Sequence, residues 1–144
     1  MTAHQPPRVP EILLVEDSQS DVELTQELLE EAGVPHRLRV ARDGEAALAE
    51  LRCPATPRPD LVLLDLNLPR VDGREVLRAV KGDDELKTIP IIVLSTSREA
   101  SDVLDCYREH ANCFISKPLN LDEFLDIVQA IERFWLTVAR LPPS

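Results

Sequence analysis

Six side chains that could take part in one reaction each follow a run of aliphatic residues. They are three carboxylates, two hydroxyls and one ammonium group: Glu16, Asp17, Asp65, Ser95, Thr96 and Lys117. Carboxylates that are crowded together repel one another, and a divalent cation relieves that repulsion. Hard oxygen ligands suit Mg²⁺, which shares its coordination sphere with phosphate. The set therefore predicts phosphoryl transfer, in which an aspartate can act as the nucleophile and form an acyl phosphate.

The stretch Leu61–Pro69 places one of these carboxylates at the end of a buried strand. Four aliphatic residues precede Asp65, and a run that is apolar on both faces is typical of a strand in a parallel sheet. Such a strand cannot hold a carboxylate in its middle without a large desolvation cost, so Asp65 should lie where the strand ends. Ligands bind at the carboxyl ends of strands in open α/β sheets. We therefore predict that Asp65 is the reactive residue.

Strand and helix patterns alternate five times along the chain. Strands are expected at 11–15, 36–41, 61–65, 90–96 and 112–116, and helices at 19–32, 44–51, 73–81, 97–110 and from 121 onward. Polar and apolar residues alternate in 36–41, which predicts a strand near an edge of the sheet. Ser18 is expected to cap the first helix, and Asp72 and Glu75 are spaced as the N-cap and the third position of the third helix. The alternation predicts βαβ units, a parallel sheet and helices on both faces, so that all strand ends share one edge.

Each reactive side chain has an ordinary structural role when it is taken alone. A Glu-Asp pair after a strand is usually a turn or a helix cap, and a Lys-Pro pair is usually a loop. Thr96 can cap a helix together with Glu99. The functional interpretation rests on all of these groups lying at successive strand ends in chain order.

Composition narrows the class of protein. A chain of 144 residues can bury the core of one domain, and 16 basic against 26 acidic residues give a net charge of −10. This charge argues against a surface for nucleic acid or for anionic membrane. No apolar run reaches transmembrane length, and the proline-punctuated lead 1–10 lacks the apolar core of a signal peptide. We therefore expect a soluble, cytoplasmic protein with a flexible lead.

The cysteines and histidines show no metal-ligand spacing. Cys53, Cys106 and Cys113 form no CxxC pair, and the histidines lie singly along the chain. Reduced, buried thiols are the expected state of the cysteines, and no zinc site is expected.

The chain resembles the receiver domain of two-component response regulators. The resemblance rests on five βα units that carry, in this order, Glu16-Asp17, Asp65, Ser95-Thr96 and Lys117-Pro118. The resemblance covers residues 11–133. It implies a flavodoxin-like, doubly wound (βα)5 fold, with a five-stranded parallel sheet of order 2-1-3-4-5. It also implies that Asp65 accepts a phosphoryl group from the phosphohistidine of a sensor histidine kinase, without turnover of a separate substrate.

The metal ligands also follow from the resemblance. Asp17 would bind Mg²⁺ directly, Glu16 would act largely through water, and Asn67 would offer its backbone carbonyl beside Asp65. Mn²⁺ could take the place of Mg²⁺. Glu16 stands where aspartate is frequent in the family.

A switch is implied as well. Ser95, with Thr96 beside it, would bind the phosphoryl group, and Lys117 would pair with it through a cis bond to Pro118. Phe114 stands where the family places a switch aromatic, frequently tyrosine. Plain core packing is the alternative role of Phe114.

Three segments suggest a subfamily. They are similar to segments of single-domain regulators that are associated with phytochrome-type sensor kinases. The three segments are E-A-G-V-P-H-R-L, D-L-N-L-P-R-V-D-G-R-E-V-L and F-W-L-T-V-A-R-L-P. This resemblance implies such a kinase as the partner.

The C-terminal segment 134–144 is a candidate dimerisation arm. Because three large apolar residues are consecutive, they must point in different directions around a helix, and exposed groups of this kind mark partner surfaces. A homodimer is expected through Phe134, Trp135, Leu136, Val138 and Leu141. The alternative is that the tail packs over its own domain.

Other functions remain open beside a stand-alone response regulator. The chain could be a phosphorelay intermediate that passes the phosphoryl group onward. An Mg²⁺-dependent phosphohydrolase with an aspartate nucleophile would need a carboxylate where Asn67 stands, and a cap domain. The complete acidic set argues against a pseudo-receiver that serves only as a scaffold. We expect no output module, because the βα units extend to about residue 140.

Overall fold

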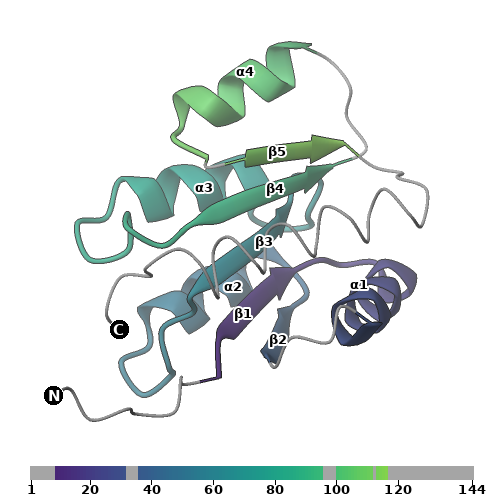
Figure 1. The fold of residues 1–144 in the computed structure, drawn as a ribbon. Helices are drawn as coiled ribbons and strands as arrows, with labels where there is room; N and C mark the ends of the chain where they lie inside the picture. Colours follow the sequence, from purple (N-terminus) through teal and green to yellow (C-terminus); the bar gives the residue numbers. More distant parts are fainter. Residues whose placement is uncertain (1–8, 32–35, 96–99, 112, 117–144) are drawn as a thin grey trace, which may run out of the picture.

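Strands and helices alternate strictly in the computed structural model, which describes residues 9–31, 36–95, 100–111 and 113–116. The elements, labelled in Figure 1, are β1 (Glu11–Val15), α1 (Gln19–Glu31), β2 (Arg37–Ala41), α2 (Gly44–Arg52), β3 (Leu61–Asp65), α3 (Gly73–Lys81), β4 (Ile91–Ser95), α4 (Ala100–Arg108) and β5 (Cys113–Ser116). The expected bounds of the strands agree with these within one residue. The N-terminal lead up to residue 8 and the last expected helix lie outside the described residues.

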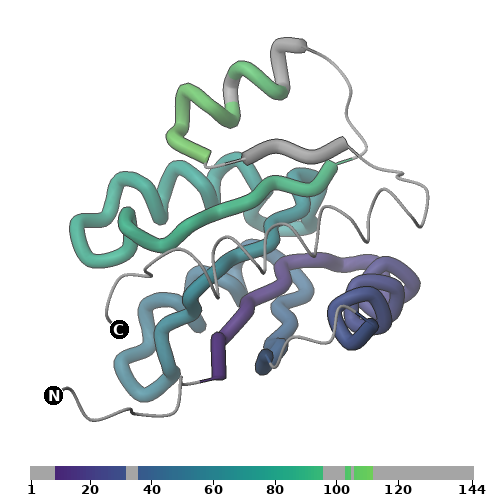
Figure 2. The backbone as a smooth tube through the Cα atoms, in the orientation of Figure 1, coloured from purple at the N-terminus to yellow at the C-terminus, as the bar shows by residue number. Residues whose placement is uncertain are grey.

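The strands form a single parallel sheet in the order β2-β1-β3-β4-β5. The tube in Figure 2 follows the chain from each strand through a helix and back to the next strand. All arrowheads in Figure 1 point toward the same side, so the carboxyl ends of the strands share one edge. The expected sheet and strand order are confirmed. β2 is an edge strand, and only Ala41 among its residues is fully buried, as its alternating sequence predicts.

The central strands bury both of their faces, and alternate residues serve different layers. In β1, Leu13 and Val15 join a cluster with residues of α2 and α3, whereas Ile12 and Leu14 join a cluster with residues of α1. Figure 1 shows α1 in front of the sheet and α2 with α3 behind it. This two-sided burial explains why the strands read as continuous aliphatic runs.

Short polar residues mark the starts of the helices. The Asp43 carboxylate accepts the Ala46 N–H at 2.7 Å, and the Ser18 hydroxyl accepts the Asp21 N–H at 3.4 Å. The expected N-cap position on α3 is confirmed, but the side-chain hydrogen bond of a cap does not form there. Asp72 lies at the N-cap, but its side chain accepts no backbone N–H there and pairs with Arg74 at 3.3 Å instead.

The cysteines differ in environment. Cys106 is buried, as expected, but Cys53 is exposed at the end of α2, so the expectation of a buried thiol is wrong there. Hydrogen bonding to the side chain of Thr56 lowers the pKa of Cys53.

Within the described ranges, no helix combines the length and the apolar character of a membrane span.

A buried carboxylate joins β1 to β3 at the edge of the sheet opposite the strand ends. Asp60 is 4% exposed, and its Oδ2 accepts the Glu11 N–H at 2.8 Å, while its own N–H donates to the Glu11 carbonyl at 2.7 Å.

Asp60→Ala should therefore lower the free energy of unfolding by about 1–3 kcal/mol, because the Glu11 amide loses its acceptor. Urea unfolding measures this effect. Asp84→Ala, at a 94% exposed side chain, is the control and should change little. An equal loss in both variants would contradict the prediction.

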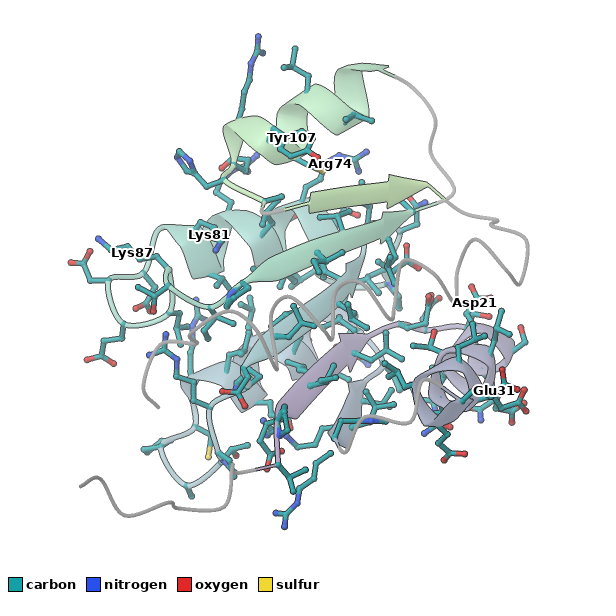
Figure 3. The ribbon with its side chains drawn as sticks, in the orientation of Figure 1. Asp21, Glu31, Arg74, Lys81, Lys87 and Tyr107 are labelled. Carbon is teal, nitrogen blue, oxygen red and sulfur yellow. The ribbon has the colours of Figure 1, made fainter. Side chains whose placement is uncertain are left out.

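Lys81 ends α3 and holds the turn before β4, where Figure 3 labels it close to Lys87. Its Nζ donates to the carbonyl oxygens of Ile89 at 2.7 Å and Lys87 at 3.0 Å. Burial lowers the pKa of Lys81, because it disfavours the charged ammonium.

The lowered pKa of Lys81 predicts a rise of stability with pH. Between the lowered native pKa and the ordinary value of about 10.4, the unfolded chain binds more protons than the native one. The penalty for burying the charge is present below the native pKa and is relieved as the pH rises through it. A neutral amine still has donors for both carbonyls. The free energy of unfolding of wild type should therefore rise relative to that of Lys81→Met as the pH is raised through this window. Urea unfolding of both proteins at the lower and the upper pH of the window measures the difference. A constant difference would contradict the assignment.

Candidate functional site

Three carboxylates meet at the carboxyl edge of the sheet, as their positions after β1 and at the end of β3 predict. One oxygen each from Glu16, Asp17 and Asp65 can be chosen so that all lie within 4.8 Å of one another. Glu16 is buried at 3% exposure, Asp65 is half-buried and Asp17 is exposed. The cluster thus combines a deep carboxylate with one that is open to solvent.

Backbone amides orient two members of the acidic cluster. The Asn67 N–H donates to Asp65 Oδ1 at 3.2 Å, and the Ser18 N–H donates to Glu16 Oε2 at 3.4 Å. The Glu16 backbone N–H donates to the Ala41 carbonyl at 2.9 Å, which continues the β1–β2 pairing by one residue. The loop after β1 is thereby held against the sheet.

The start of α3 packs directly on the end of β3. The Gly73 N–H donates to the Leu66 carbonyl at 2.9 Å. A Cβ atom at Gly73 would lie 2.3 Å from the Asp65 carbonyl oxygen and 2.6 Å from the Leu66 Cα, so only glycine fits without a backbone shift. This contact sets the position of the backbone that carries Asp65.

The loop between β3 and α3 is also held by α2. A Cβ atom at Gly44 would lie 2.0 Å from the Val71 carbonyl oxygen, so the first turn of α2 contacts this loop closely. Arg70 has a φ of 66°, and its guanidinium lies 3.4 Å from a Glu45 oxygen and 3.7 Å from an Asp43 oxygen. The loop that carries Asn67 is therefore fixed by α2 as well as by α3.

Ser95 lies on the strand next to Asp65. It ends β4 with 0% exposure, and the preceding residue, Leu94, is the partner of Asp65 in the β3–β4 register. Ser95 itself pairs in register with Ser116 of β5. The expected hydroxyl thus reaches the edge of the sheet that carries the carboxylates.

Several predicted site residues cannot be compared with the structure. Thr96, Lys117, Pro118 and the arm residues 134–141 lie outside the described residues. Phe114 lies in β5, where its backbone pairs in register with Val93.

Sequence reasoning missed the two close glycine contacts. By their pattern, Asp43-Gly44 and Asp72-Gly73 indicate only helix starts, although both glycines fix the loop beside Asp65. A glycine directly after an N-cap residue, where side chains are ordinarily tolerated, is the signal that could have revealed them.

The acidic cluster fits a small, hard divalent cation. Its donors are carboxylate oxygens, one of them buried, and bringing three such charges together is unfavourable without a counter-charge. Oxygen donors of this kind favour Mg²⁺ over zinc, which prefers nitrogen and sulfur ligands.

Comparison with known proteins agrees with the fold and the site. Residues 12–129 match the family described as the response regulator receiver domain. Response regulator Rcp1 from Synechocystis sp. is 48% identical over 143 residues, which cover 96% of each chain. The crystal structure of the phosphorylated cyanobacterial phytochrome response regulator RcpA has a TM-score of 0.86 at 48% identity and covers 94% of this chain and 100% of that one. The Mn²⁺-bound form of Rcp1 has a TM-score of 0.84 at 47% identity, with 93% and 99% covered. The similarity therefore spans nearly the whole chain.

Proposed function

Because the chain belongs to the response regulator receiver domain family, we propose that it is a stand-alone response regulator that is switched by phosphorylation of Asp65. The observation that carries the proposal is the cluster of Glu16, Asp17 and Asp65 at the carboxyl edge of the sheet. Asp65 is the member at the end of β3, where an amide orients its carboxylate. One relative of similar sequence was crystallised in its phosphorylated form.

In the proposed reaction, an Asp65 carboxylate oxygen attacks the phosphorus of a phosphohistidine. The new O–P bond forms as the P–N bond breaks, and the imidazole leaves with the electron pair and takes up a proton. The Asn67 N–H holds the other end of the carboxylate and so favours one orientation for attack. Lys117 would balance charge on the phosphoryl oxygens.

The Mg²⁺ would be held by Glu16, Asp17 and Asp65 together with the Asn67 carbonyl. Bound there, the cation would supply positive charge beside the phosphoryl oxygens. A relative with 47% identity was crystallised with Mn²⁺, which supports a divalent cation at this edge. The half-buried Asp65 can thus serve as ligand and as phosphoacceptor.

The switch would lie at the ends of β4 and β5. Ser95, with Thr96 beside it, would bond the phosphoryl group, and Phe114 would respond from the neighbouring strand. The adjacency of β4 and β5 supports this, because Ser95 and Phe114 lie on directly paired strands. A cis peptide bond before Pro118 would direct Lys117 into the site.

The proposed partner is a phytochrome-type sensor histidine kinase in the cytoplasm. RcpA, which is 48% identical, is described as a cyanobacterial phytochrome response regulator. The proposed form is a homodimer through the arm at 134–144. The chain would turn over no substrate other than its own phosphoryl group, and it would either keep that group as a signal or pass it onward in a relay.

Incubation with Mg²⁺ and acetyl phosphate tests the function. Acid-stable, base-labile phosphate on the protein, lost when EDTA is present, is the expected result. Rapid hydrolysis of phosphomonoesters without such labelling would instead favour a phosphohydrolase and overturn the proposal. Asn67 argues against that alternative, because it stands where such an enzyme needs a second carboxylate.

A further inference from the structure

A groove between α3 and α4 gathers positive charge on a protein that is otherwise strongly acidic. Its volume is about 230 Å³, and it is lined by Arg74, Leu77, Arg78, Cys106, Arg108 and Glu109. Three guanidinium groups thus face one carboxylate, whereas the whole chain has a net charge of −10. The groove is therefore a local reversal of the molecule's charge.

Two of the three guanidinium groups in the lining are exposed to solvent. Arg78 pairs with Glu109 at 3.2 Å and remains 64% exposed, so it is open to a further ligand. Arg74 pairs with Asp72 at 3.3 Å. Arg108 ends α4, and its side chain is exposed to solvent. Arg78 and Arg108 are thus the solvent-exposed cations of the described lining.

The floor of the groove is apolar. Leu77 and Cys106 are 0% and 1% exposed and belong to the core cluster behind the sheet. These two side chains close the bottom of the groove and offer almost no surface themselves, whereas α4 leaves Leu104 and Tyr107 about half exposed, at 49% and 47%. Figure 3 shows Tyr107 extending from α4 and Arg74 from α3 in the region where these two helices meet. The surface thus offers both cationic and apolar contacts, and its size suits a few side chains rather than a large ligand.

We propose that the groove between α3 and α4 is a docking site for an acidic, partly apolar peptide segment of a partner protein. Carboxylates of the segment would pair with Arg78 and Arg108, and an aliphatic side chain would contact the exposed Leu104 and Tyr107 on α4. Charge complementarity favours such a segment, because guanidinium groups bind carboxylates in a planar, bidentate geometry.

The acidic helix of this protein does not fill the groove. α1 carries Asp21, Glu23, Glu27, Glu30 and Glu31, but it packs on the opposite face of the sheet, as Figure 1 shows. Docking of α1 from a second copy would join different surfaces of the two copies, and such contacts do not close into a dimer unless a ring forms. Two copies with a net charge of −10 each also repel one another. A segment of a different protein is therefore the occupant that we propose.

Fluorescence anisotropy with a labelled peptide of repeated Glu-Leu-Leu-Glu tests the proposal on the full, unphosphorylated chain. Arg78→Glu and Arg108→Glu should each weaken binding about tenfold or more, which corresponds to about 1.4 kcal/mol. Arg37→Glu is the matched control: it makes the same charge change at a 71% exposed side chain of β2 and should bind like wild type. Because no phosphorylation is involved, this result is independent of the function proposed for Asp65.

Other outcomes would overturn the proposal. Equal binding of a Gln-Leu-Leu-Gln peptide would show that charge is not recognised. Equal weakening by all three substitutions would show a response to net charge alone. Binding that none of them changes would place the peptide elsewhere. Sedimentation of the chain without peptide gives the last result: self-association that Arg78→Glu abolishes would make the occupant a second copy.

Discussion

Asp65→Asn is expected to abolish phosphorylation by acetyl phosphate in the presence of Mg²⁺. The amide has no anionic oxygen to attack phosphorus, and it removes one charge from the acidic cluster. The substitution keeps the shape of the side chain and an oxygen that can accept the Asn67 N–H, so the loop should stay in place. Mass spectrometry of the intact protein, or its migration in a phosphate-binding gel, measures the loss.

Asp83→Asn is the matched control for this experiment. It makes the same charge change in the turn between α3 and β4, at the edge of the sheet opposite the strand ends. Phosphorylation of this variant should equal that of wild type. Full labelling of Asp65→Asn would move the phosphoacceptor to another residue, and equal loss in both variants would indicate an effect of charge alone.

Gly73→Ala is expected to destabilise the protein and to slow its phosphorylation. The new Cβ atom would lie 2.3 Å from the Asp65 carbonyl oxygen and 2.6 Å from the Leu66 Cα, both of which are backbone atoms. Overpacking of this kind costs about 1–3 kcal/mol, because the start of α3 and the end of β3 must move apart. A small displacement of a reacting group costs about tenfold or more in rate. Urea unfolding and the rate of labelling by acetyl phosphate measure the two effects.

Gly82→Ala provides the comparison at the other end of α3. Its Cβ atom would lie 3.1 Å from the Arg78 carbonyl oxygen, and its φ of −87° is one that alanine adopts readily. This variant should change the free energy of unfolding by less than about 1 kcal/mol and leave the labelling rate unchanged. If Gly73→Ala behaved in the same way, the contact with Asp65 would not constrain the site.

The fold could be predicted because its signals are local. Aliphatic runs such as Leu61–Leu64 indicate strands that are buried on both faces, and the alternation with helices restricts the topology to parallel βαβ units. The structure confirms the sheet, its order and the edge position of β2. The wrong expectation concerns Cys53, whose side chain is exposed, where competing environments are close in energy.

The sequence by itself determined which groups meet at the edge of the sheet. Glu16, Asp17 and Asp65 follow buried strands, and the desolvation cost of a charge inside the sheet places them at the strand ends. Only the tertiary structure decided how the phosphoacceptor strand is held and where the positive charge gathers. The contact of Gly73 with Asp65 and the groove that joins Arg78 to Arg108 both arise where separate elements of the chain pack together. Close contacts of that kind depend on distances between elements, and residue type and spacing along the chain do not encode those distances in any local pattern.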